Sequence, residues 1–119
     1  MFQGALLVNY LGHGGSKGWA QERFLDINDI EGWTNINRLP LFVTATCSFT
    51  GYDDPTFVTA GERAFLNPKG GVIGLMTTVR AVFASSNERL TRAVFERVFE
   101  KIDGKNIPFG DIILLGKND

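Results

Sequence analysis

The stretch "LPLFVTATCSF", residues 39–49, is an uncharged apolar run that ends beside a cysteine. Apolar runs of this length, bounded by turn residues, are typical of strands that are buried on both faces of a parallel sheet. Pro40 lies at the entry of the run, where a strand tolerates a missing N–H group. The stretch therefore predicts a buried strand, with Cys47 close to its carboxyl end.

Two further runs have the same character. "ALLVNYL", residues 5–11, carries no charge, and "GGVIGLMTTV", residues 70–79, is rich in β-branched residues. Both predict strands. The three predicted strands are separated by segments long enough to cross from one parallel strand to the next.

Helical signals occupy these segments and the end of the chain. A short helix is expected near 28–33, with Asp26 and Asn28 as candidate N-caps, and a second helix over about 57–66. A long helix is expected to begin at Ser85, which has capping-box spacing to Glu88, and to stop at Gly104. The beginning of another helix follows it. The alternation predicts one compact α/β unit, a mostly parallel sheet with helices on both faces.

Composition narrows the function classes. The 119 residues carry 12 basic and 13 acidic side chains, with no basic cluster, so no nucleic-acid partner is expected. No apolar run reaches the roughly 20 residues of a membrane helix. Cys47 is the only cysteine and His13 the only histidine, which falls short of the usual ligand set of a zinc site. We expect no metal and no cofactor.

The placement of His13 and Cys47 has a direct chemical interpretation. His13 follows the first strand in "GHGG", and Cys47 follows the second, 47 − 13 = 34 residues later. Functional groups of parallel sheets gather beyond the carboxyl ends of strands. A thiolate next to an imidazole can attack a peptide carbonyl, and the imidazole can protonate the leaving amine. The unshielded N–H of Gly14 is then a candidate oxyanion donor.

Other interpretations stay open. A histidine in a glycine-rich turn is often a surface residue, and a lone cysteine often packs in a core. Trp19 either lines the cleft and contacts substrate or packs as a half-buried aromatic. Asp53 and Asp54 have two interpretations. They serve the site, by orienting the imidazole or binding substrate, or they belong to a solvated turn. Arg80 either touches substrate or lies on the surface. The whole domain is either a peptidase or a protein-binding module without activity.

"NYLGHGG" followed by "LPLFVTATCSF" resembles the caspase-like cysteine peptidases and, among them, the gingipain family. The blocks "GWAQER", "AGERAFLNPKGG" and "GDIILLGKN" extend the resemblance over nearly the whole chain. They are most similar to the sortases that act as C-terminal signal peptidases in the type IX secretion system of Bacteroidetes.

The resemblance implies a caspase-like fold, with Cys47 as nucleophile, His13 as catalytic histidine, and the N–H groups of Gly14 and Cys47 as the oxyanion hole. It implies that residues 1–119 are the C-terminal portion of a gingipain-type peptidase domain within a longer protein at the cell surface, on the outer membrane. The expected partners are secreted cargo with C-terminal signal domains and other secretion-system proteins. Without the first strands of the sheet, this chain is expected to associate with itself through the edge of residues 5–11 or through the exposed face beside that edge.

Overall fold

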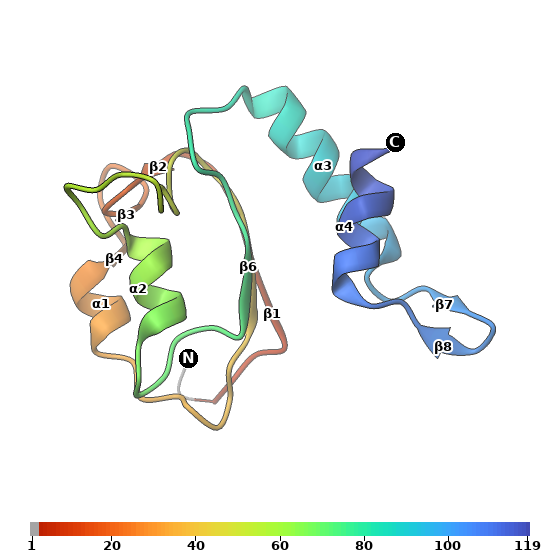
Figure 1. The fold of residues 1–119 in the computed structure, drawn as a ribbon, viewed down its shortest axis with the longest axis horizontal. Coiled ribbons are helices and arrows are strands. Elements are labelled where there is room, and N and C mark those ends of the chain that lie inside the picture. The colour runs from red at the N-terminus through yellow and green to blue at the C-terminus, as the bar shows by residue number, and fades with distance from the viewer. Residues whose placement is uncertain (1–2) are drawn as a thin grey trace. The chain divides into compact units, whose positions relative to one another are not determined.

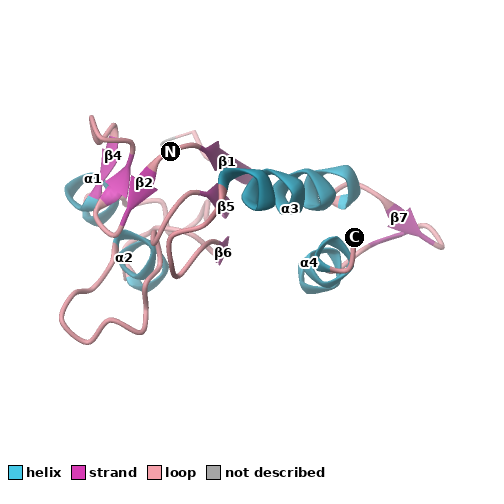
Figure 2. Cartoon of the chain, turned by 90° about the horizontal axis from the view of Figure 1, so that it is seen from above, coloured by secondary structure: helices cyan, strands magenta, loops and turns pink. Residues whose placement is uncertain are grey.

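The computed structural model describes residues 3–119, which form two compact units, one up to Val82 and one from Phe83 to Asp119. The sequence had predicted one unit. The first unit (Figure 1) is built on a parallel sheet in the order β1-β5-β6, which can be followed in Figure 2. These strands are β1 (Leu7–Leu11), β5 (Leu41–Ala45) and β6 (Gly74–Met76). All three predicted strands are thus present and parallel, and β6 is shorter than its predicted run.

The middle strand and the edge strand differ in burial. In β5, Phe42 to Ala45 are all buried, as predicted for a strand covered on both faces. In β1, Val8 and Tyr10 pack on the core, whereas Asn9 and Leu11 are exposed. The prediction that β1 is buried on both faces was therefore wrong. The physical reason is its position at the edge of the described sheet, where one strand neighbour is present instead of two.

Two helices, α1 (Ile27–Glu31) and α2 (Ala60–Leu66), lie together on one face of the sheet (Figure 1). Their inward side chains join strand and loop residues in one apolar core. That core consists of Trp19, Ile30, Phe42, Phe49, Ala60, Ala64 and Val72.

Both helices begin at side-chain caps. Asp26, one of the two predicted N-caps of α1, accepts from the Asp29 N–H at 3.0 Å, and the Asp29 carboxylate accepts from the Asp26 N–H at 3.0 Å. In α2, the Glu62 carboxylate accepts from both the N–H and the hydroxyl of Thr59, each at 2.7 Å. These bonds satisfy amide groups that a first helical turn leaves without intrahelical partners.

A small antiparallel sheet follows β1, where the sequence indicates only a glycine-rich turn. It consists of β2 (Gly14–Gly15), β3 (Gly18–Trp19) and β4 (Leu25–Asp26), in that order (Figure 1). The Ser16–Lys17 turn between β2 and β3 is also anchored, because the Ser16 carbonyl accepts from the Ala60 N–H at 2.8 Å. The glycines after His13 are therefore part of a defined hairpin.

The second unit contains α3 (Ala84–Arg97), β7 (Lys101–Ile102), β8 (Lys105–Asn106) and α4 (Phe109–Lys117). Helices α3 and α4 pack against each other, with Ala93, Val94, Ile112 and Gly116 buried. Among residues 3–119, no helix is both long and apolar enough to cross a membrane.

Two details of the long helix were predicted wrongly. The helix is preceded by Phe83 as N-cap, without a side-chain cap bond, and Ser85 lies inside its first turn. It ends at Arg97 instead of Gly104. Gly104 has φ of 74° and, with Asp103 at φ of 51°, forms the turn of the β7–β8 hairpin. An Asp-Gly pair favours this kind of two-residue hairpin turn, and here that preference exceeds the helical periodicity of the flanking residues.

Candidate active site

The parallel register brings the two candidate catalytic residues to neighbouring strand tips. β1 and β5 pair from Leu7 with Leu41 to Leu11 with Ala45. One residue further on, the Gly12 N–H still donates to the Ala45 carbonyl at 3.2 Å. His13 and Cys47 each lie two residues beyond the last pair of this register. The predicted placement of the two residues at the ends of adjacent parallel strands is confirmed.

His13 is held through its backbone while the residue remains exposed. Its carbonyl oxygen accepts from the Tyr10 hydroxyl and from the Ala20 N–H, both at 2.7 Å. The Tyr10 ring in turn stacks on Trp19, with 4.4 Å between ring centroids and 11° between ring planes. The apolar core thus fixes the start of the histidine loop, and the imidazole is available at the surface.

Cys47 is half-buried in a loop with an unusual backbone. Its Sγ lies 3.9 Å from the Val82 carbonyl oxygen. Ser48, the next residue, has φ of 49°, in the left-handed region that a residue with a Cβ seldom adopts. The Ser48 N–H donates to the Arg80 carbonyl at 3.2 Å, which helps to hold this conformation. Backbone strain of this kind recurs at functional sites, where surrounding contacts must maintain it.

Threonines on both sides of the cysteine join its loop to the segment after β6. Thr77 bonds to the hydroxyl of Thr44 at 2.9 Å and to that of Thr50 at 3.2 Å. The Thr78 carbonyl accepts from the Thr50 N–H at 3.1 Å, and the Thr78 hydroxyl donates to the Thr46 carbonyl. Sequence reasoning missed this network. The one sequence feature that could have indicated this network is the number of threonines at the ends of two predicted strands, in "TATCSFT" and "TTV".

Gly14 lies where the histidine hairpin meets the cysteine strand. A Cβ at this position would come within 2.3 Å of Thr46 Oγ1 and 3.0 Å of the Gly18 carbonyl. Gly14 pairs with Trp19, whereas the Ala20 N–H bonds to the His13 carbonyl. Hydrogen-bonded and non-bonded pairs alternate along an antiparallel ladder, so the Gly14 N–H points away from β3. The Gly14 N–H is therefore not used by the β2–β3 ladder.

Trp19 lies in the core, as the packing interpretation expects. It is 6 % exposed, and its ring lies 5.5 Å from that of Phe42 and 5.9 Å from that of Phe49. A ring buried in this way has little surface to offer a substrate. Its contribution to the site is indirect, since it supports Tyr10 and the hairpin that follows His13.

Asp53 and Arg80 form an ion pair with two hydrogen bonds. The pair links the segment that follows Cys47 to the segment that follows β6. Arg80 Nη1 lies 2.8 Å from Asp53 Oδ1, and Nη2 lies 2.5 Å from Oδ2. The hydrogen bond from Arg80 lowers the pKa of the Asp53 carboxyl, and the same bond raises the pKa of Arg80. Both side chains remain largely in water. The pair lies on the surface, and a substrate contact by either residue stays a prediction.

Asp54 belongs to a local turn, as its solvated-turn interpretation expects. One carboxylate oxygen accepts from the Thr56 N–H at 2.8 Å and from the Thr56 hydroxyl at 2.6 Å. The hydroxyl bond is the main cause that lowers the pKa of Asp54. Both aspartates that were considered for orienting the imidazole are therefore bonded to other groups. Residues 3–119 also contain no group of three or more His, Cys, Asp or Glu arranged to hold a metal ion.

A parallel sheet with histidine-glycine and cysteine at adjacent strand ends is the arrangement expected of a caspase-like α/β domain. The family profile of peptidase family C25 matches residues 1–119, and the chain belongs to this family of cysteine peptidases. The predicted membership of the gingipain family is thereby confirmed. No protein of curated function matches the sequence.

The fold is similar to a solved complex of the pro- and mature domains of RgpB from Porphyromonas gingivalis, with a TM-score of 0.75 and 21 % sequence identity. The similarity covers 84 % of this chain and 24 % of the solved chain. It confirms the predicted caspase-like fold. The chain therefore spans about a quarter of the length of this structural relative.

Proposed function

We propose that this chain supplies the catalytic strand tips of a cysteine peptidase, with Cys47 as nucleophile and His13 as general acid and base. The observation that carries the proposal is the parallel register, which ends β1 and β5 together and leaves the two residues at the same level beyond it. The family membership supports the same chemistry. The alternative is a domain of the same fold that binds proteins without cleaving them.

In the proposed reaction, the thiolate of Cys47 attacks the carbonyl carbon of a peptide bond. The developing oxyanion accepts hydrogen bonds from the N–H groups of Gly14 and Cys47. His13 then gives a proton to the departing amine, and the C–N bond breaks to leave a thioester on Cys47. Water or an incoming amine attacks the thioester, which returns the thiol and releases either an acid or a new amide.

The finer proposal concerns the cargo. We infer that the whole protein is a PorU-type sortase, which removes the C-terminal signal domain of secreted proteins and transfers the cargo to surface lipopolysaccharide. The support is the similarity of the blocks around residues 18–23, 60–71 and 110–118 to those enzymes. Its place of action is then the outer membrane surface, and its partners are cargo proteins and other components of the secretion system.

The reactivity of the thiol tests the peptidase proposal. The rate of alkylation by iodoacetamide is measured against pH, and Cys47 is the only thiol of this chain. With an imidazole beside it, the Cys47 thiol should react faster at neutral pH than a free cysteine does. In His13→Ala the rate should fall toward that of a free cysteine. Tyr52→Phe, at an exposed position, serves as the control and should leave the profile unchanged.

A profile near that of free cysteine in both the unaltered protein and His13→Ala would favour the binding module. The cargo proposal is tested separately in the intact protein, by following release of the C-terminal domain from secreted cargo. Peptide cleavage without cargo release would contradict the sortase assignment and leave the peptidase assignment standing.

A further inference from the structure

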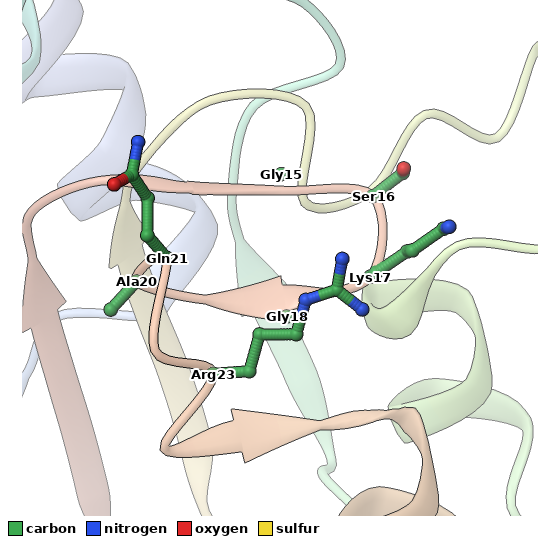
Figure 3. Close-up of a pocket in the computed structure, with 7 residues that line it drawn as sticks. All are labelled: Gly15, Ser16, Lys17, Gly18, Ala20, Gln21 and Arg23. Atoms are coloured by element: carbon green, nitrogen blue, oxygen red, sulfur yellow. The ribbon is translucent and has the colours of Figure 1, made fainter.

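The hairpin that follows His13 encloses a second feature, a pocket of about 350 Å³. Figure 3 shows its lining: Gly15, Ser16, Lys17, Gly18, Ala20, Gln21 and Arg23. Two cations are among these residues, and no carboxylate is. The Arg23 side chain extends across Gly18 toward the turn that carries Lys17 (Figure 3). Positive charge therefore gathers at the turn end of the hairpin.

Neither cation is neutralised within the described part of the chain. The ion pairs found in residues 3–119 involve Arg63, Arg80, Arg92 and Arg97, and each of these arginines has its own acidic partner. Lys17 and Arg23 take part in none of these pairs. Glu22 is adjacent in sequence, but it is exposed and does not line the pocket. Lys17 and Arg23 can therefore donate charge-assisted hydrogen bonds to a ligand, and no acidic side chain of the pocket lining competes for them.

The backbone that positions Arg23 is constrained. Arg23 has φ of 52° and Ala20 has φ of 61°, so two residues with side chains adopt the left-handed conformation on one wall of the pocket. The Arg23 N–H bonds to the Ala20 carbonyl at 3.4 Å, and the Ala20 N–H bonds to the His13 carbonyl at 2.7 Å. The arginine is therefore connected to the catalytic histidine through two successive backbone hydrogen bonds.

One residue of the lining is close to His13 along the chain. Gly15 lies two residues after His13, and an extended chain advances about 3.3 Å per residue, so the Cα atoms of the two residues lie within roughly 7 Å of each other. That distance corresponds to one or two residues of an extended peptide. A polypeptide held at Cys47 can therefore place a nearby side chain in the pocket.

We propose that this pocket is a subsite for an acidic side chain of the polypeptide substrate, near the bond that Cys47 attacks. The inference rests on the proposed function. Lys17 and Arg23 donate to the carboxylate, and the small residues of the turn admit the substrate chain. A glutamate or aspartate close to the scissile bond therefore binds more tightly than its amide counterpart.

Binding to the intact protein in its Cys47→Ala form tests the subsite without turnover. The probes are acetylated and amidated octapeptides of alanine and glycine that carry one glutamate, moved along the peptide, each with a glutamine twin. Calorimetry should show the glutamate peptide binding about tenfold more tightly at one or two positions, and the advantage should shrink as salt rises. Lys17→Gln and Arg23→Asn should each remove most of the advantage.

Asparagine is chosen at position 23 because it tolerates the left-handed backbone there. Lys69→Gln is the control, since it removes one exposed cation of the same unit from outside this pocket. It should retain the full preference for glutamate. Equal binding of the twins at every position or no measurable binding of any glutamate peptide would overturn the proposal. So would a preference for glutamate that survives when Lys17→Gln and Arg23→Asn are combined.

The two proposals fail separately. If the protein with Cys47 intact cleaves no peptide while Cys47→Ala still prefers glutamate through Lys17 and Arg23, the peptidase function fails and the acidic subsite stands. If both twins are cleaved with equal kcat/KM and bound alike, the subsite fails and the peptidase stands. Capture of vesicles rich in anionic lipid through the same two cations, with the peptide twins bound alike, would also overturn the assignment to substrate side chains.

Discussion

At the scale of single residues, Gly14 shows how tightly the two strand tips approach each other. The space that a side chain would need is already taken by Thr46 Oγ1, a buried hydroxyl that has no hydrogen-bond partner among residues 3–119. Because Thr46 directly precedes Cys47, a side chain at position 14 would push the cysteine strand away from the histidine hairpin. The absence of a Cβ is thus part of the site.

Gly14→Ala should therefore destabilise the first unit by about 1–3 kcal/mol, through overpacking, and reduce peptide cleavage. Thr46→Ala alone should cost less, because the hydroxyl that it removes is buried without a partner. The double variant should recover much of the stability lost in Gly14→Ala. Urea unfolding of the two single variants and the double variant gives the coupling energy. Strictly additive losses would contradict the steric explanation.

Cys47→Ala should abolish processing at a cost of about 1 kcal/mol or less in stability, since it removes one half-buried sulfur at a strand tip. His13→Ala should cause a similar loss of activity, because neither thiolate formation nor protonation of the leaving group stays efficient. The two losses should not add in the double variant, since the residues act as one unit. The measurement is single-turnover cleavage by each variant. Full activity of Cys47→Ala would rule out the nucleophile assignment.

The Asp53–Arg80 pair predicts a dependence of stability on acid pH. Its hydrogen bond lowers the pKa of Asp53 below the ordinary 3.8, so the folded state binds the proton less readily than the unfolded state. The stabilisation is therefore fully present above pH 3.8 and is lost as pH falls through the lowered value. Asp53→Asn should have a flatter melting temperature between pH 5 and pH 2. An identical acid limb in Asp53→Asn would show that the pair contributes nothing.

At the scale of elements, the side-chain cap of α2 is the clearest local contribution to the stability of the first unit. The Glu62 carboxylate accepts two bonds from Thr59, so Glu62→Ala should cost about 0.5–2 kcal/mol of stability. Glu22→Ala is the control at an exposed glutamate of the same unit and should stay within about 0.5 kcal/mol of the unaltered chain. Thermal unfolding of the two variants makes the comparison. Equal melting temperatures would contradict the capping role.

The strands of the main sheet could be predicted because their apolar runs are long enough to show the period and burial of a strand. The placement of His13 and Cys47 followed from that order together with the general geometry of parallel sheets. The β2–β3–β4 sheet could not be predicted, because strands of two residues leave no period in a sequence. The long helix was extended too far because its apolar spacing continues to Ile102, beyond the point where the hairpin with Gly104 begins.

The ion pair and the threonine network lay beyond sequence reasoning for a different reason. Asp53 and Arg80 are 27 positions apart, and Thr44 and Thr77 are 33 apart. Nothing in either local sequence identifies its partner. Contacts of this kind depend on how far the segment after β6 runs alongside the cysteine loop, which only the three-dimensional structure shows. The placement of the two candidate catalytic residues was thus predictable, whereas the contacts that hold their loops in place were not.

At the scale of the whole molecule, the unpaired edge of the main sheet carries the remaining prediction. β1 has β5 on one side, and its other edge presents backbone N–H and C=O groups without a strand neighbour among residues 3–119. Leu6 is 79 % exposed and Leu11 is 54 % exposed at the two ends of this strand. An open edge with apolar side chains is a template for pairing with another chain. In a longer protein that contains this domain, a further strand could pair with the same edge.

The 119-residue chain should therefore associate with itself through β1, with a mass that rises with concentration in size-exclusion chromatography with light scattering. Leu11→Lys should shift the chain toward the monomer, because a second strand that paired at this edge would have to pack against the charged lysine. Leu66→Lys replaces a leucine that is 68 % exposed at the end of α2, away from this edge, and should leave the association unchanged. A monomer at every concentration, or equal effects of the two lysines, would contradict an interface at this edge.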